Sequence, residues 1–151
     1  MKTLNDILAA HDQEVQATTA GSIMHERLRN VVIDGDTVTG DQDLIEKIIV
    51  KPELVPFFTT TSKTEVPIAG ILDGDFVSRR LDRIKIDDTT KEIWVLDYKT
   101  DTDSQRFHDK YIAQIHEYVA LLHMIYPGYK IRAYILWTHD FSLENITLKS
   151  V

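Results

Sequence analysis

The spacing of apolar residues divides the chain into a helical first part and a strand-rich second part. In the first part, apolar residues recur every three or four positions over residues 22–32 and again over residues 42–50. We expect each segment to form an amphipathic helix, the first with Ser22 as its N-cap and the second with Asp41 or Asp43. The segment "ELVPFF" that follows predicts a short helical turn.

From residue 64 onward, apolar and polar residues alternate as they do in strands. Segments 64–72 and 75–86 flank Asp73-Gly74, a dipeptide that favours a tight hairpin turn. A third apolar segment, residues 93–99, follows the turn sequence "DDTTKE". Short turns between consecutive strands join antiparallel neighbours, so the three segments predict an antiparallel meander.

The clearest helix is predicted over residues 110–126, and Pro127-Gly128 ends it. One broad face of this helix carries Tyr111, Ile112, Ile115, Tyr118, Val119, Leu122 and Ile125. A fourth strand is predicted over 130–138 and a fifth over 145–150. Helices, a meander, and a helix that crosses to another strand predict an α/β or α+β fold with a mixed central sheet flanked by helices.

Composition limits the classes of protein to which the chain can belong. Its 151 residues suit one domain, which we place at 1–151 with a core over about 21–138. No apolar stretch is long enough to span a bilayer and the N-terminus has acids where a signal peptide needs an apolar core, so we expect a cytoplasmic protein without a membrane partner. The absence of Cys excludes disulfides, thiol nucleophiles and iron–sulfur clusters.

The net charge of −7 bears on nucleic acid as a partner. Proteins that bind DNA through phosphate contacts alone are usually basic. Three interpretations remain open: DNA is not the partner, another protein supplies most of the binding, or a metal cation lies between carboxylates and phosphate.

An acid and a base end the third predicted strand, in "EIWVLDYKTD". Asp97 and Lys99 are two residues apart, so they point to the same face, and Asp82 on the preceding strand is a candidate cross-strand neighbour. Two adjacent carboxylates repel each other unless a cation lies between them, and their hard oxygens suit Mg²⁺ or Mn²⁺. A nearby lysine could orient or deprotonate a water, or stabilise charge on a phosphate. This combination indicates metal-dependent phosphodiester hydrolysis.

Each of these features also has a simpler interpretation. Charged residues that close a strand are commonly solvated. A lone histidine such as His25 on the first helix is commonly a surface residue, and Gln114 and Tyr118, four apart, would lie at the boundary and in the core. Three arginines on the second strand are equally suited to phosphate and to solvent: Arg79, Arg80 and Arg83.

Taken in order, five motifs resemble those of the RecB/AddA-type nuclease domain of the PD-(D/E)XK nuclease superfamily. They are "GSIMHERL", "EVPI", "VSRRLDRI", "VLDYKTD" and "YIAQIHEYVALL". Each motif is weak alone, and their order and spacing from about Gly21 to Tyr134 make the resemblance. It implies a restriction-endonuclease-like core.

The resemblance implies a metal site for Mg²⁺ or Mn²⁺. The family's first-motif histidine matches His25, and the aspartates of its "GRIDR" and "DYKT" motifs match Asp82 and Asp97. The backbone carbonyl of the residue after the second aspartate, here Tyr98, completes the protein ligands in that family.

The remaining motif positions imply catalytic and positioning roles. Lys99 matches the catalytic base or electrostatic helper, and the "QxxxY" pair, Gln114 and Tyr118, would position the lysine, the water or the DNA. Glu65 in "EVPI" matches a recurrent position to which we assign no role. The sequence departs from the family at Arg79, where "SRRLDR" replaces the usual "SGRIDR". An arginine there would either crowd the site or add a phosphate contact.

The function that the resemblance implies is a metal-dependent DNA nuclease, an exonuclease or endonuclease active in double-strand-break repair and DNA-end processing. The sequence contains no P-loop, so we expect a UvrD-like helicase motor in the same polypeptide or complex to feed DNA to it. The chain is then either an excised domain or a standalone relative. The alternative is a non-catalytic nuclease-fold module for DNA binding or subunit docking, and a third interpretation is a restriction-type endonuclease.

Overall fold

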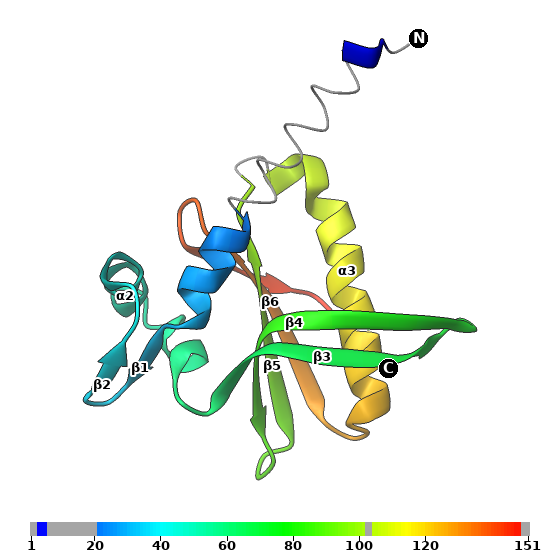
Figure 1. Cartoon of the computed structure of the whole chain (residues 1–151). Helices are drawn as coiled ribbons and strands as arrows, with labels where there is room; N and C mark the ends of the chain where they lie inside the picture. The colour runs from blue at the N-terminus through cyan, green and yellow to red at the C-terminus, as the bar shows by residue number, and fades with distance from the viewer. Residues whose placement is uncertain (1–2, 6–20, 102–103, 149–151) are drawn as a thin grey trace.

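The alternating segments of the second half form one five-stranded mixed sheet, flanked by helices (Figure 1). The computed structural model describes residues 3–5, 21–101 and 104–148. In sheet order, the strands are β3 (Ser62–Leu72), β4 (Asp75–Asp87), β5 (Glu92–Lys99), β6 (Lys130–Trp137) and β7 (Ser142–Ile146). Strands β5 and β6 are parallel and the other neighbours are antiparallel, so the predicted α/β class and the β3-β4-β5 meander are confirmed.

Helix α3 (Ser104–Ile125) crosses from β5 to β6 and packs on one face of the sheet. It begins at residue 104, before the predicted start at 110, and the pattern missed these first residues because Phe107 is the one apolar residue among them. It ends before Pro127 and Gly128, as predicted, and Gly128 has a φ of 84° that suits glycine. Strand β7 begins three residues earlier than predicted. No helix of the described residues is long and apolar enough to cross a membrane.

The other face of the sheet is covered by the first part of the chain. This part comprises helical residues 21–29, β1 (Val32–Asp34), β2 (Thr37–Thr39), α2 (Gln42–Ile49) and the 3₁₀ turn η1 (Val55–Phe58). Asp41 caps α2 by accepting the Leu44 N–H at 3.2 Å, which confirms one of the two predicted caps.

Two details of the first predicted helix are wrong. Gly21 is already helical, so Ser22 lies inside the helix and is not its N-cap. The helix ends at residue 29 because Val32 pairs with Thr39 in the β1–β2 hairpin. These strands are only three residues long, too short for an alternating pattern to stand out.

The sheet separates two apolar cores. One lies between the sheet and α3 and contains Ile93 and Val95 of β5, and the other lies beneath the first part of the chain and contains Leu96 and Tyr98. Val95 and Leu96 lie in different cores because successive side chains of a strand point to opposite faces of the sheet. The same alternation places Asp97 on the face of α3 together with Lys99, which confirms the predicted shared face of these two residues.

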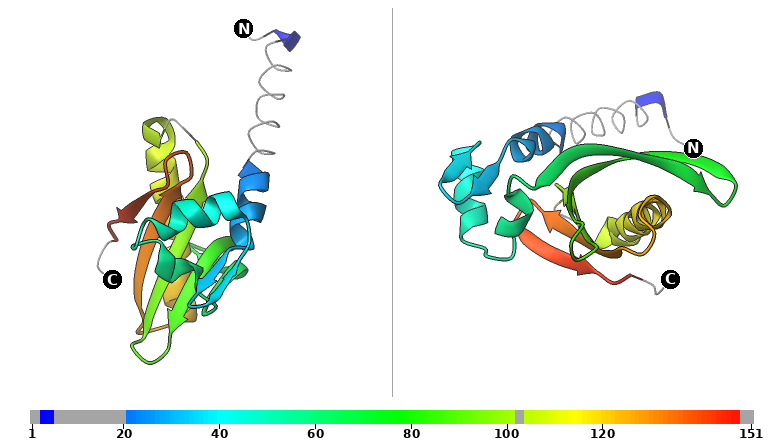
Figure 2. Two further views of the ribbon diagram at one scale, coloured as in Figure 1. Left: turned by 90° about the vertical axis from the view of Figure 1, so that its left-hand side faces the viewer. Right: turned by 90° about the horizontal axis from the view of Figure 1, so that it is seen from below.

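Strands β3 and β4 extend past the rest of the sheet as a two-stranded arm, which arches over α3 on the side away from β6 and β7 (Figure 2). The alternation of side chains breaks where the arm begins, because Leu81 and Ile84 both lie in the core beneath α3. At the same place Glu65, between the paired residues Thr64 and Val66, has a φ of 54°. A left-handed residue other than glycine is uncommon, and this one marks the twist that carries the arm away from β5.

Candidate active site at the fork of the sheet

The candidate site lies where β4 separates from β5, a point we call the fork and define by Asp82 and Asp97. Pairing between the two strands runs from Asp87 opposite Glu92 to Arg83 opposite Leu96 and then stops. Asp82 is the next residue, and its Oδ2 accepts a hydrogen bond from the Tyr98 N–H at 2.8 Å. The carboxylate therefore satisfies a backbone donor that would otherwise pair with β4. Asp82 and Asp97 are cross-strand neighbours, as predicted, and their carboxyl groups lie close enough for the charge of Asp82 to raise the pKa of Asp97.

Asp97 is almost completely buried, with 3% of its surface exposed. Burial and the charge of Asp82 raise its pKa to about 7, against the opposing charge of Lys99. Lys99 Nζ lies 2.9 Å from Asp97 Oδ2, yet this buried oxygen has no partner in hydrogen-bonding geometry among the described residues. A buried carboxylate oxygen of this kind is suited to accept a cation.

His25 reaches the fork from the helix on the opposite side of the sheet. Its Nδ1 lies 2.6 Å from the Gly21 carbonyl oxygen and its Nε2 lies 3.2 Å from Asp82 Oδ2. Burial acts to lower the pKa of His25, but the hydrogen bond and charge of Asp82 outweigh it and raise the pKa. Burial conversely acts to raise the pKa of Asp82, which the bond and charge of His25 hold below its usual value. The two residues form an ion pair when His25 is protonated.

Lys99 is held by α3 as well as by Asp97. Its Nζ donates to Gln114 Oε1 at 2.8 Å and lies 4.5 Å from the centre of the Tyr111 ring. Gln114 is thus in contact with Lys99, as the "QxxxY" motif implied. Tyr118, one turn further along α3, is buried in the core, and burial together with the charges of Asp97 and Asp82 raises its pKa.

Tyr111 is a site residue that the sequence pattern placed only on the broad apolar face of the long helix. Its ring contacts Lys99 and its hydroxyl donates to Asp101. The spacing from Gln114 could have indicated this role, because residues three apart on a helix share a face.

Tyr98 contributes to the fork through its backbone, while its side chain points into the opposite core. The hydroxyl accepts a hydrogen bond from Arg83 Nε at 2.9 Å, and burial raises its pKa to about 12. Arg83 is itself buried, so it meets neither phosphate nor solvent, the two environments considered for it from sequence. Its guanidinium instead donates to the backbone carbonyls of Phe57, Leu28, Arg29 and Val31 and to Ser62 Oγ.

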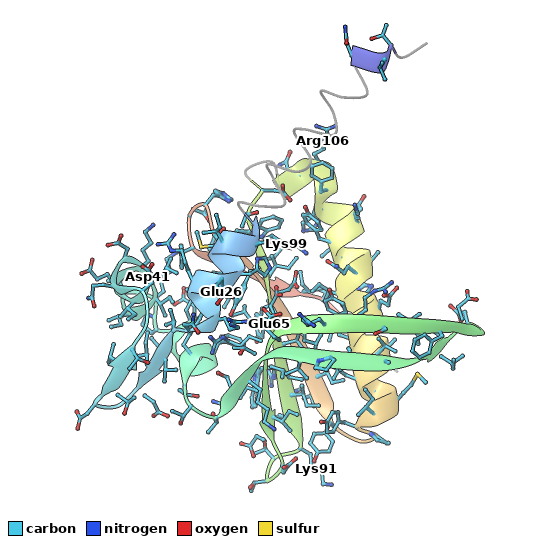
Figure 3. All side chains as sticks on the ribbon, in the orientation of Figure 1. Glu26, Asp41, Glu65, Lys91, Lys99 and Arg106 are labelled. Carbon is cyan, nitrogen blue, oxygen red and sulfur yellow. The ribbon has the colours of Figure 1, made fainter. Side chains whose placement is uncertain are left out.

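An open pocket of about 590 Å³, which we call the site pocket, lies at the fork. Its centre is formed by His25, Asp82 and Lys99, and its rim includes two Arg–Glu pairs. One pair joins Arg29 to Glu26 on the helix, and the other joins Arg80 to Glu65 across the arm at 3.6 Å. Figure 3 shows Glu26, Glu65 and Lys99 gathered at this end of the sheet, with Lys91 at the opposite end.

A second pocket of about 410 Å³, the side pocket, lies between the arm and α3. Lys99 and Tyr111 line both pockets, so they form the wall between them. Arg79 lines the side pocket and its Nε lies 2.5 Å from Glu117 Oε1 of α3. Arg79 is absent from the lining of the site pocket, so it does not crowd the fork.

The residues at the fork fit a divalent cation in their donor chemistry. Within residues 3–5, 21–101 and 104–148, no three His, Asp or Glu side chains are already arranged as a metal site. At the fork, His25 instead pairs with Asp82, and Lys99 pairs with Asp97. When His25 Nδ1–H donates to the Gly21 carbonyl, the neutral ring presents the Nε2 lone pair to the pocket. Metal-binding histidines are commonly held by such a bond to a backbone carbonyl.

No protein-family model matches the chain, and no curated protein matches its sequence. The geometry of the fork and the motifs that it brings together therefore carry the functional proposal.

Proposed function

We propose that the chain is a Mg²⁺- or Mn²⁺-dependent DNA nuclease with a PD-(D/E)XK-type core, similar to the nuclease domains of RecB/AddA-type helicase–nucleases. The observation that carries the proposal is the convergence of Asp82, Asp97 and Lys99 at the fork, with His25 added from the opposite face. Two carboxylates in contact, one of them buried, are costly in a fold unless they serve a purpose there. In a metal-dependent phosphodiesterase, such a pair of carboxylates binds the cation.

The protein ligands would be Asp82, Asp97, His25 and the backbone carbonyl of Tyr98. When bound, a divalent cation supplies charge neutralisation for the scissile phosphate and lowers the pKa of a coordinated water. To bind the cation, the ligands would have to release their protons to solvent. Asp97, whose pKa is about 7, loses its proton, and neutral His25 offers Nε2.

Lys99 performs the remaining chemistry at the fork. Its ammonium group is fixed between Asp97 and Gln114, with the Tyr111 ring beside it. In this position it can orient a water or stabilise negative charge on a phosphate oxygen. Gln114 acts through Lys99 as a positioning residue, and Tyr118 packs behind both.

The partners follow from the same proposal. DNA, as ends or as single strands, would enter the site pocket. The net charge of −7 gives the chain little long-range attraction for a polyanion. A UvrD-like helicase motor in the same polypeptide or complex would supply the basic track, and the function would lie in double-strand-break repair and DNA-end processing.

A metal-dependent cleavage assay tests the proposal. Labelled single- and double-stranded DNA is incubated with the protein in Mg²⁺, in Mn²⁺ and in chelator, alongside the Asp97→Ala and Lys99→Ala variants. We expect cleavage with either metal and its loss in chelator and in both variants. Equal cleavage by the variants would disprove the assignment of these residues.

The same samples distinguish the nuclease from the alternative function. A non-catalytic module for DNA binding or docking would show no cleavage in any metal, and calorimetry would detect no Mn²⁺ binding that depends on Asp82. Binding of Mn²⁺ that disappears in Asp82→Asn protein supports the nuclease.

A further inference from the structure

Arg79 lies in the side pocket, on the other side of Lys99 from the fork. The cations that line this pocket besides Lys99 are Arg79 from the arm and Lys110 from α3, and its acid is Glu117. A strand that places one phosphate in the site pocket can leave it past the wall formed by Lys99 and Tyr111. The side pocket is the next concave surface beyond that wall, and its cations exceed its acids.

We propose that Arg79 and Lys110 bind the phosphate next to the scissile one, so that the side pocket is the exit subsite for a single DNA strand. The proposal rests on the proposed function, and it adds a binding site that the family motifs do not assign. Arg79 stands where those motifs have glycine. Tyr111 adds an aromatic ring between the subsites, which a sugar or base can contact as the strand passes.

Arg79 retains hydrogen-bonding capacity for this role. Its Nε contacts Glu117 and its Nη1 donates to the Ser78 carbonyl, whereas a guanidinium carries five N–H donors. Among the described residues, these two contacts use only part of that capacity. Further N–H groups of Arg79 therefore remain for an anion. The side chain is 42% exposed, so a phosphate can reach it.

Glu117 then acts as a competitor for Arg79. Its carboxylate holds the guanidinium at 2.5 Å, and an incoming phosphate must share or displace that contact. A purely structural ion pair between the arm and α3 would behave in the opposite way, since its loss would loosen the pocket and weaken binding. Tighter DNA binding by Glu117→Gln protein therefore indicates a phosphate subsite, and weaker binding indicates a structural ion pair.

The test measures binding of a fluorescent single-stranded oligonucleotide by anisotropy over a range of salt concentrations. Ca²⁺ replaces Mg²⁺, because its looser coordination disfavours hydrolysis. The variants are Arg79→Ala, Arg79→Lys, Lys110→Ala and Glu117→Gln. The controls are Lys130→Ala, at the opposite end of the sheet from Lys99, and Glu46→Gln on α2, which remove the same charges elsewhere.

We expect Arg79→Ala and Lys110→Ala each to weaken binding about three- to tenfold and to reduce the slope of log K against log salt by about 0.7. Arg79→Lys should retain the slope, and Glu117→Gln should tighten binding beyond Glu46→Gln. Unchanged slopes in protein that cleaves DNA, or weaker binding by Glu117→Gln, would overturn the subsite alone. Wild-type protein that neither binds nor cleaves DNA would overturn the proposed function and the subsite together.

Discussion

Asp82 Oδ2 accepts the backbone N–H of Tyr98 at 2.8 Å, so one carboxylate completes the sheet at the fork and also faces the site pocket. The same oxygen lies 3.2 Å from His25 Nε2. Asp82 therefore has a structural role and a chemical role, and substitutions can separate them because asparagine keeps an acceptor oxygen and loses the charge.

Asp82→Asn and Asp82→Ala should both abolish Mn²⁺ binding, but they should differ in stability. The alanine variant leaves the Tyr98 N–H without its partner, which costs about 1–3 kcal/mol when the group is buried. We expect its free energy of unfolding to be lower than that of the asparagine variant by about this amount. Urea denaturation and calorimetry measure the two effects on the same samples, and equal stabilities would show that water replaces the carboxylate.

Lys99→Met should reduce DNA cleavage by at least 100-fold, the usual size of a proton-transfer or charge-stabilising contribution. It should also destabilise the protein at pH 8 by about 1–3 kcal/mol, because it leaves the buried Asp97 charge without its cation. The loss of stability should shrink at pH 5.5, where Asp97, with a pKa of about 7, is protonated and neutral. Urea denaturation at both pH values measures it.

Lys130→Ala is the matched control for this prediction, since Lys130 lies opposite Glu92 at the far end of the sheet. It should change neither cleavage nor the pH dependence of stability. A loss in Lys99→Met that is equal at pH 5.5 and pH 8 would show that packing of the lysine stem, and not charge, is responsible.

The stability of the metal-free protein should fall as pH rises from about 4 through about 7. The folded protein binds more protons than the unfolded chain in this window, because the pKa of Asp97 rises from 3.8 to about 7 on folding. The raised pKa of His25 acts in the same direction above pH 6.5, and the lowered pKa of Asp82 acts oppositely, below pH 3.8. Denaturation midpoints in chelator between pH 4 and pH 8.5 measure the slope, which Asp97→Asn should reduce.

Metal binding should have the reverse dependence on pH. Mg²⁺ or Mn²⁺ must displace the proton of Asp97 and, where the ring is protonated, a proton of His25, so affinity should rise by up to about tenfold per pH unit for each proton displaced and level off only above the pKa values of both groups. Calorimetry in buffers of different ionisation enthalpy would also detect the released proton. A metal affinity that is constant from pH 5.5 to pH 8 would place the cation away from Asp97.

Arg83→Lys should destabilise the protein by about 3–5 kcal/mol, although Arg83 is not one of the proposed metal ligands. The planar guanidinium donates to the backbone at the end of helical residues 21–29 and to Tyr98, and an ammonium cannot reproduce these directions. Thermal or urea denaturation measures the change. Arg80→Lys is the control, because Arg80 is 69% exposed and should tolerate the substitution within about 0.5 kcal/mol.

Local patterns in the amino-acid sequence predicted most helices and strands and the pairing of the two strands that carry Asp82, Asp97 and Lys99. The alternation along "IWVLDYK" placed Asp97 and Lys99 on one face, and the turn residues between strands paired that segment with the one carrying Asp82. These are short-range properties, because side-chain direction and turn geometry depend on neighbours within a few residues. The β1–β2 hairpin was missed because strands of three residues carry too little pattern.

Only the tertiary structure decided how the site is assembled and what surrounds it. The fork, the approach of His25 from the other face, the burial of Arg83 and the side pocket around Arg79 all join residues that are distant in sequence. Arg79, Arg80 and Arg83 look alike in "SRRLDR", yet one pairs with α3, one with β3, and one is buried. Local sequence cannot distinguish them, because the environment of each depends on acids and carbonyls that folding brings from distant segments.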